Sequence, residues 1–422
     1  MSLIASRYRG LYASLFVVFL LFGTSMTIVG ASLPTILSDF SWSYGVAGVV
    51  IAAGAAGYFL ASLAGGAFLK RIGAKWTSAL GLALSALGLA FFASTPSALL
   101  NLALNALIGL GQGLIEPTVN WAVVRMDEKG DGRAMNLIHG SFAIGAVAGP
   151  MALGLLLGAG LVWTLLYRAI AVLFAVIAAI MVFLPFEVLE RRESGKAAVP
   201  SADAAAGGGS GGDSPVAREK AAGTPLGRRP TYWIGFVGLL VYVGTEQGIS
   251  NWIAEYFVKV FSANPAVAAG MVSLFWIGLL AGRFGAPALY RGTRQDSLLA
   301  AASVLLALTL ISLNVVGFAG AVPFWTGPVL TFLAGLGCSI IYPVTISLVG
   351  ASSPDEQERA VSFAVAGGGL GLFAFPFIMS WVSQAWGIRA GFLGYALIAA
   401  LTCAASFALA SAYMKEKRDR EA

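Results

Sequence analysis

The feature that most constrains this chain is a ladder of about a dozen apolar segments, each long enough to cross a bilayer, whose second half repeats the first. The clearest repeat is Gly109–Pro117 (GLGQGLIEP), which recurs as Gly335–Pro343 (GLGCSIIYP) 226 positions later (335 − 109). The same offset links three further pairs: Arg133 and Arg359, Gly145 and Gly371, and Pro150 and Pro376. A repeat of this length inside apolar segments indicates two homologous halves, an organisation that many secondary transporters share.

The composition is that of a membrane-spanning chain. Of the 422 residues, 58% are hydrophobic and 11% are charged, whereas a soluble domain carries about 25% charged residues. The apolar runs are continuous and lack the period-two alternation of a closed barrel. We therefore predict an all-α membrane protein with twelve transmembrane helices in two homologous six-helix halves. The expected spans are residues 11–37, 46–69, 76–94, 97–125, 134–158, 162–185, 231–258, 266–290, 296–317, 322–349, 359–382 and 388–414.

A polar segment separates the two halves. It includes Ala202–Asp213 (ADAAAGGGSGGD), a composition that cannot bury a core and remains flexible. We expect a six-helix half at residues 1–185, a flexible cytoplasmic linker at 186–230, and a second six-helix half at 231–422 that ends in a short cytoplasmic tail.

Basic residues orient the chain in the bilayer. They cluster in the N-terminus, in alternate loops, in the linker and in the tail, and Lys259 and Arg389 are the exceptions on the opposite side. The positive-inside rule then places both termini and the linker in the cytoplasm of a multi-pass inner (plasma) membrane protein. This distribution accounts for the sequence pI near 9.3, so no nucleic-acid partner is inferred. The first apolar run is too long for a cleaved signal and is interpreted as a retained span.

Several motifs resemble the major facilitator superfamily, and the resemblance covers essentially the whole chain. The segment Gly66–Lys75 (GAFLKRIGAK) is similar to that superfamily's signature between spans 2 and 3, with Lys70 at the usual acidic position. Within the superfamily, three segments resemble the fucose–galactose–glucose:proton symporter group: Gly109–Asn120, Asn136–Gly145 and Tyr242–Trp252. The resemblance implies a transporter rather than an enzyme, with substrate binding near the midplane between the halves. It also implies that spans 1, 4, 7 and 10 line the cavity.

Span 4 carries the clearest polar pattern. At 100° per residue, five side chains share one stripe about 100° wide: Asn101, Asn105, Gln112, Glu116 and Asn120. For Asn101 and Asn105 we favour hydrogen bonding between helices. An ionised group at mid-bilayer costs roughly 2.5–3.5 kcal/mol, and an apolar setting favours the protonated form of a carboxyl group. Glu116 is therefore the first candidate for a proton carrier, and a permanent ion pair is the alternative.

Span 7 is polar over half of its circumference. Tyr242, Glu246 and Ser250 form one strip, and Gln247 and Asn251 form a second. Glu246 is expected to accept a sugar hydroxyl or to act as a second proton site, and amides both donate to and accept from hydroxyl groups. The complete set predicted to bind substrate is Gln112, Asn120, Tyr242, Glu246, Gln247, Asn251, Trp252 and Tyr342. For Trp252, stacking on a sugar ring and simple packing are equally weighted alternatives.

A predicted gate lies toward the cytoplasmic ends of the helices. Arg283 in span 8 and His139 in span 5 lie at similar depth, and Glu116 is slightly deeper. We hypothesise that these three close the inner gate and separate when Glu116 is protonated. The alternatives are snorkelling of Arg283 to the interface and packing of His139 between helices. Lys70 and Arg71 complete the predicted gating set.

These observations predict a proton-coupled symporter that carries a sugar or similar polyol inward by alternating access. The alternatives are a proton-driven exporter of drugs or metabolites, an uncoupled sugar facilitator, and a substrate sensor that no longer transports. The expected partners are the small solute, protons and the lipid bilayer, and the chain is expected to be monomeric. No motif for a cofactor, nucleotide or metal ion is present, and Cys338 and Cys403 are interpreted as small apolar fillers.

Overall fold

The computed structural model describes residues 4–127, 133–186, 189, 225–289, 294–319, 323 and 325–421, so most of the linker predicted at 186–230 lies outside the described residues. The described residues are helical almost throughout, as predicted. The helices are α1 (Arg9–Phe40), α2 (Tyr44–Phe91), α3 (Ala98–Met126), α4 (Arg133–Gly158), α5 (Thr164–Phe183), α7 (Pro230–Val260), α8 (Pro265–Leu289), α9 (Gln295–Ala319), α10 (Thr326–Cys338), α11 (Ile341–Ser352), α12 (Gln357–Trp386) and α13 (Ile388–Glu421), with short 3₁₀ turns at Ser6–Tyr8, Leu226–Arg228 and Pro354–Glu356.

These helices supply the twelve predicted spans. Helix α2 has 48 residues, or roughly 70 Å at 1.5 Å per residue, which is enough for two crossings. It bends at Gly73, whose φ of 79° is readily adopted only by glycine. Helices α10 and α11 together form one span. Helix α7 is long enough to span but less apolar than the others, because it contains Glu246, Gln247, Asn251 and Glu255.

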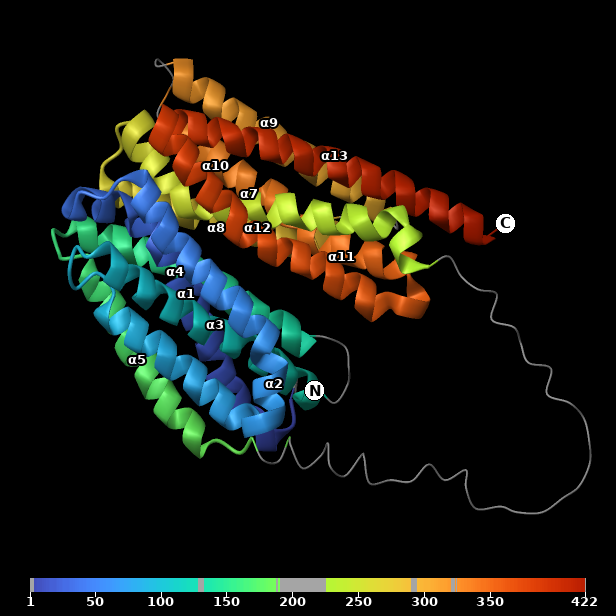
Figure 1. The fold of residues 1–422 in the computed structure, drawn as a ribbon, viewed down its shortest axis with the longest axis horizontal. Helices are drawn as coiled ribbons and strands as arrows, with labels where there is room; N and C mark the ends of the chain where they lie inside the picture. The colour runs from blue at the N-terminus through green and yellow to red at the C-terminus, as the bar shows by residue number, and fades with distance from the viewer. Residues whose placement is uncertain are drawn as a thin grey trace, which may run out of the picture.

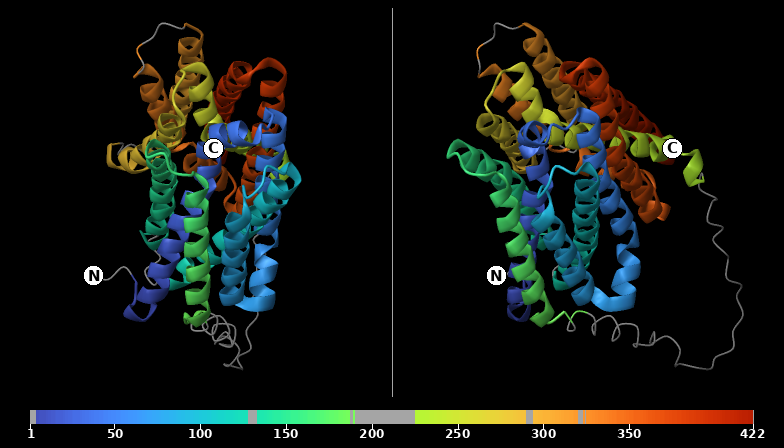
Figure 2. Two further views of the ribbon diagram at one scale, coloured as in Figure 1. Left: turned by 90° about the vertical axis from the view of Figure 1, so that its left-hand side faces the viewer. Right: turned by 60° about the vertical axis from the view of Figure 1, so that its left-hand side comes forward.

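The two halves lie side by side (Figure 1). Helices α1–α5 form one bundle and α7–α13 form the other, as two further views also show (Figure 2), and in Figure 1 both termini lie toward the same end of the helices. We call this the linker end, and the opposite one the far end. At the linker end, hydrogen bonds join helix ends. The Tyr12 hydroxyl donates to the Ala134 carbonyl at 2.8 Å, and Arg229 Nη1 donates to the Ser352 carbonyl at 2.6 Å.

The repeated glycines mark equivalent helix crossings in the two halves. A Cβ atom at Gly109 would lie 2.0 Å from the Gly54 carbonyl oxygen, where α3 crosses α2. A Cβ atom at Gly335 would lie 1.9 Å from the Phe275 carbonyl oxygen, where α10 crosses α8. Glycine therefore lets the backbones approach more closely than any other residue would allow.

A second glycine pair repeats this arrangement. A Cβ atom at Gly145 would lie 1.9 Å from the Leu20 carbonyl oxygen, between α4 and α1. At Gly371 the corresponding distance is 2.0 Å, to the Leu240 carbonyl oxygen, between α12 and α7. The sequence repeat is therefore a repeat of helix packing.

Substitution of these glycines should destabilise the protein. Gly145→Ala and Gly371→Ala each place a methyl group on a backbone oxygen, and such overpacking costs about 1–3 kcal/mol. Thermal unfolding in detergent should show a lower midpoint for both variants. Gly270→Ala in α8 is the matched control, because nothing lies within 4 Å of a Cβ atom there. An equal midpoint for all three variants would contradict this packing argument.

Candidate substrate and proton site

A large cavity of about 1160 Å³ lies between the two halves. Asn136 and Gln295, which stand near the linker ends of α4 and α9, line one part of it. Glu116 and Glu246 line the deeper part, so each half contributes one carboxyl group. The cavity also includes the predicted gating residues His139 and Arg283 and the predicted substrate contact Tyr342.

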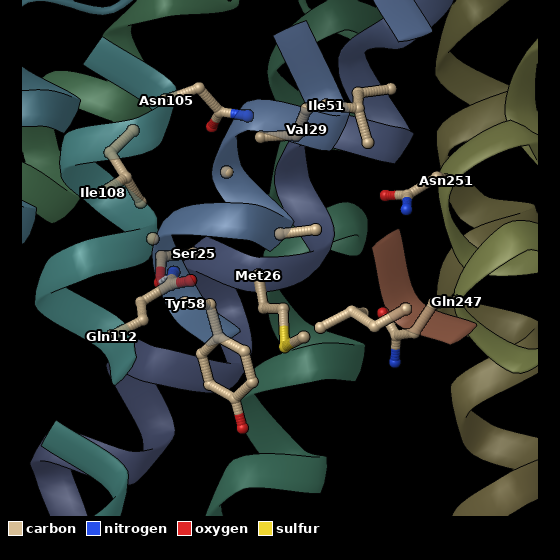
Figure 3. Close-up of a pocket in the computed structure, with 14 residues that line it drawn as sticks. Ser25, Met26, Val29, Ile51, Tyr58, Asn105, Ile108, Gln112, Gln247 and Asn251 are labelled. Carbon is tan, nitrogen blue, oxygen red and sulfur yellow. Dashed lines mark hydrogen bonds between the residues drawn. The ribbon is translucent and has the colours of Figure 1, made fainter. Parts of the chain in front are cut away.

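A smaller pocket of about 60 Å³ adjoins the large cavity (Figure 3). We call it the amide pocket, because four amide side chains line it: Asn105 and the three predicted substrate contacts Gln112, Gln247 and Asn251. Gln112 approaches from α3, and Gln247 and Asn251 approach from α7 on the other side of Met26. The two spaces share four lining residues: Met26, Tyr58, Gln247 and Leu372.

Hydrogen bonds fix the first-half side of the amide pocket. Gln112 Nε2 donates to Ser25 Oγ at 2.9 Å, and Asn105 Nδ2 donates to the Val50 carbonyl of α2 at 2.7 Å. Asn105 thus makes the bond between helices that the sequence suggested, although it also lines the pocket. Among the described residues, the Asn101 side chain bonds to backbone groups of residues 93–97 in the turn before α3, and not to another helix as the sequence suggested.

Each carboxyl group in the large cavity accepts a hydrogen bond from a tyrosine. The Tyr58 hydroxyl of α2 donates to Glu116, and the Tyr242 hydroxyl donates to Glu246. Gln247 Nε2 also donates to Glu246 Oε1 at 3.2 Å. Among the residues that the structure describes, neither carboxylate forms an ion pair, so the alternative of a permanent ion pair at Glu116 has no partner in that part of the chain.

The break in the tenth span positions two further predicted residues. Pro343 lacks the N–H group that would bond to the Ser339 carbonyl one turn earlier, and the helix is interrupted between Cys338 and Ile341. Arg283 Nε donates to the free Ser339 carbonyl at 3.3 Å. The Tyr242 hydroxyl lies 2.9 Å from the Cys338 carbonyl.

The predicted gating trio lies on one cavity but is not bonded together. Glu116, His139 and Arg283 all line the large cavity, and no hydrogen bond or ion pair between described residues joins them. The His139 ring instead packs edge-on against Phe19, with ring centroids 5.3 Å apart. The gate formed by these three residues therefore remains a prediction, and in this conformation it is not closed.

Other predicted residues lie outside both cavities. Trp252 is fully buried and packs against Tyr44, with ring centroids 5.8 Å apart, so the packing alternative describes it in this conformation. Asn120 lines neither cavity, and its Oδ1 atom is buried without a partner among the described residues. Lys70 and Arg71 are exposed just before the bend at Gly73. Their predicted roles remain predictions.

A polar contact that sequence reasoning missed joins the halves toward the far end. The Tyr44 hydroxyl donates to Glu255 Oε1 at 2.8 Å, and the next residue, Gly45, donates its N–H to Gln384 Oε1 at 3.3 Å. Glu255 is only 1% exposed. Its position four residues after Asn251 extends the second polar strip of α7, so the strip could have revealed it. Tyr44 carries no such signal.

Comparison with known proteins identifies the family. The model of the Major Facilitator Superfamily matches residues 15–327 and 297–422. The chain belongs to the major facilitator superfamily. This match and the helical fold confirm the predicted family, the predicted twelve-helix fold and the assignment as a transporter rather than an enzyme.

Relatives of this transporter cover most of its length. It is 25% identical to the "Bypass of stop codon protein 6" of Saccharomyces cerevisiae, over 88% of this chain and 77% of that protein. It is also 25% identical to a glucose/galactose transporter of Brucella abortus, over 92% and 91% of the two chains. A bacterial homologue of the human lysosomal transporter Spinster, solved inward-facing and occupied, shares the fold with a TM-score of 0.75 at 13% identity, covering 98% and 99%.

The hydrogen bond between Tyr44 and Glu255, which we call the far-end contact, should hold the two halves of the transporter together. Tyr44→Phe removes a hydrogen bond to a carboxyl group, which contributes about 1.5–3 kcal/mol net. The population with separated far ends should therefore rise by at least about tenfold. Distances between spin labels on the exposed residues Ser41 and Asn264, one in each half, report this population.

The matched control removes a tyrosine hydroxyl within one half. Tyr167 bonds to Ser32 at 2.7 Å inside the first bundle, so Tyr167→Phe should leave the label distances unchanged. A distance distribution that is identical for Tyr44→Phe and the unsubstituted chain would show that the contact does not hold the far ends together.

Proposed function

We propose that this transporter is a proton-coupled symporter that carries a sugar or similar polyol inward across a bacterial-type inner membrane. The observation that carries the proposal is the shared cavity: Glu116 and Glu246, one from each half, face the same space beside the amide of Gln247. A carboxyl group held by neutral donors can take up and release a proton, and amides suit a solute with many hydroxyl groups.

The choice of a sugar rests on the pocket's chemistry and on the relatives. The amide pocket presents Gln112, Gln247 and Asn251 with a hydroxyl group from Ser25. Such groups bind neutral polar solutes, whereas exporters of amphipathic drugs favour aromatic and apolar walls. The Brucella abortus relative is named a glucose/galactose transporter, so we select D-glucose and D-galactose as the first substrates to test.

The linker end is assigned to the cytoplasm. The positive-inside rule supports this assignment for both termini and the linker. Exposed tryptophans are consistent with two membrane interfaces, since Trp76 and Trp233 lie toward the linker end and Trp325 and Trp386 lie toward the far end. In this orientation the large cavity faces the cytoplasm and the far-end contact closes the external side.

Transport then follows from rocking of residues 1–185 against residues 231–422. Glu116 is the first proton site and Glu246 the second, because an ionised carboxylate opposes passage through a closed apolar interface at a cost of roughly 2.5–3.5 kcal/mol. Protonation removes that charge before the halves close around the substrate. An uncoupled facilitator would use Glu116 as a structural ion-pair partner, and no described residue supplies that pair.

Proton flux in proteoliposomes tests this proposal. With a pH-sensitive dye inside, addition of D-glucose or D-galactose outside should acidify the lumen. Glu116→Gln should abolish most of this acidification, while Glu358→Gln, at an exposed position on α12, should leave it unchanged. Failure of every sugar to acidify the lumen would sink the symport proposal. If Glu116→Gln keeps the full proton signal, Glu116 is not the proton carrier.

A further inference from the structure

Two polar residues stand where the amide pocket meets the large cavity. Of the four residues that line both spaces, Met26 and Leu372 are apolar, and Tyr58 and Gln247 are polar. Both polar side chains donate a hydrogen bond to a carboxyl group of the large cavity: Tyr58 to Glu116 and Gln247 to Glu246. One such link belongs to each half of the transporter.

The strength of these links depends on the charge of the carboxyl group. An ionised carboxylate only accepts hydrogen bonds, and a bond to an ionised group is roughly twice as strong as one between neutral groups. When the carboxylate gains a proton from water, one oxygen becomes a donor and the hold on its neighbour weakens. Tyr58 keeps its own proton throughout, and that O–H group is then free to turn toward another acceptor.

We propose that Tyr58 and Gln247 are positioning residues that transmit protonation of Glu116 and Glu246 to the bound substrate. With the carboxylates ionised, both donors are held by them. With the carboxyl groups protonated, both donors are released to the hydroxyl groups of a sugar seated at the junction of the two spaces. This inference rests on the proposed symport function and adds the residues through which the proton favours sugar binding.

The geometry favours these two residues over the other polar groups of the pocket. Gln112 is bonded to the neutral Ser25 hydroxyl, so its hydrogen bond does not change with pH. In Figure 3 the Tyr58 hydroxyl points away from Asn105 and out of the amide pocket, which is consistent with its bond to Glu116 in the large cavity. Tyr58 therefore touches both the substrate space and the proton site.

Other ionisable groups also face the two carboxyl groups. They come from α2, α4, α7, α8, α10 and α11: Tyr58, His139, Tyr242, Arg283, Cys338 and Tyr342. Of these, His139 changes its charge nearest to neutral pH. His139 is present in the unsubstituted chain and in the Tyr58 variant alike. The test therefore compares the pH response of the variants rather than their absolute affinities.

The experiment measures sugar affinity at two pH values. The full chain in lipid nanodiscs is titrated with D-glucose and with D-galactose at pH 6 and pH 8.5, and the ratio of the two Kd values is the readout. Coupling between sites commonly amounts to about 5–150-fold, so the unsubstituted transporter should bind sugar at least about fivefold more tightly at pH 6. Tyr58→Phe and Gln247→Leu should each reduce that ratio by about threefold or more.

A double-mutant cycle separates transmission from simple contact. In the Glu116→Gln background, Tyr58→Phe should no longer alter the ratio, because the group whose charge it transmits is gone. Tyr167→Phe, which removes a tyrosine hydroxyl outside both spaces, should keep the ratio of the unsubstituted chain. If Tyr58→Phe weakens binding equally at both pH values, Tyr58 is only a contact and the inference is overturned.

The same measurements distinguish a failure of the transmission role from a failure of the proposed symport function. If sugar drives proton entry but the Kd ratio is unchanged by Tyr58→Phe and Gln247→Leu, symport stands and the transmission role fails. If no sugar binds at either pH and none drives proton entry, both the symport proposal and this inference fail. A ratio of one in the unsubstituted transporter also overturns the inference.

Discussion

The membrane imposes one requirement on which the chemistry of this transporter depends: a polar group inside a span needs a partner from the protein. Glu116, Glu246 and Glu255 lie well inside their helices, and each accepts a hydrogen bond from a tyrosine hydroxyl. A tyrosine satisfies the carboxylate without adding a compensating positive charge. The carboxyl group therefore remains able to gain and lose a proton, whereas an arginine partner would hold it ionised.

The helix packing repeats in the two halves and the polar site does not, because the two features depend on different residues. The packing depends on glycines that occur in both halves and bring equivalent helices together. The chemistry depends on places where the two halves differ in structure, even where the sequence repeats, as at the proline pair. Pro117 lies in the unbroken helix α3, but the span that contains Pro343 is interrupted at residues 339 and 340. The Cys338 and Ser339 carbonyl groups at this interruption are the ones that Tyr242 and Arg283 contact.

The sequence predicts the arrangement of the helices better than it predicts the hydrogen-bond partners of the polar groups inside them. Apolar length and the repeat offset predict the spans, and helical spacing places Glu116 and Gln112 on a common face. The polar strip of α7 also contains Glu255, one turn beyond the predicted strip residue Asn251. Tyr58 is different, because one aromatic residue in an apolar span has no periodic signal. Its pairing with Glu116 depends on how α2 rotates against α3, which only the packed structure determines.

The order of the polar groups along the interface gives the proposed mechanism a direction. The Tyr44–Glu255 contact lies toward the far end, the amide pocket comes next, and Glu116 and Glu246 lie on the large cavity that extends toward the linker end. A solute that enters from the far end therefore meets the amides before it reaches the carboxyl groups. In the conformation described here both carboxyl groups line this cavity together with Asn136 and Gln295, which stand near the linker ends of their helices. In the proposed mechanism, deprotonation on that side restores the hydrogen bonds from Tyr58 and Gln247 to the carboxylates, and the loss of these donors weakens solute binding where the solute leaves.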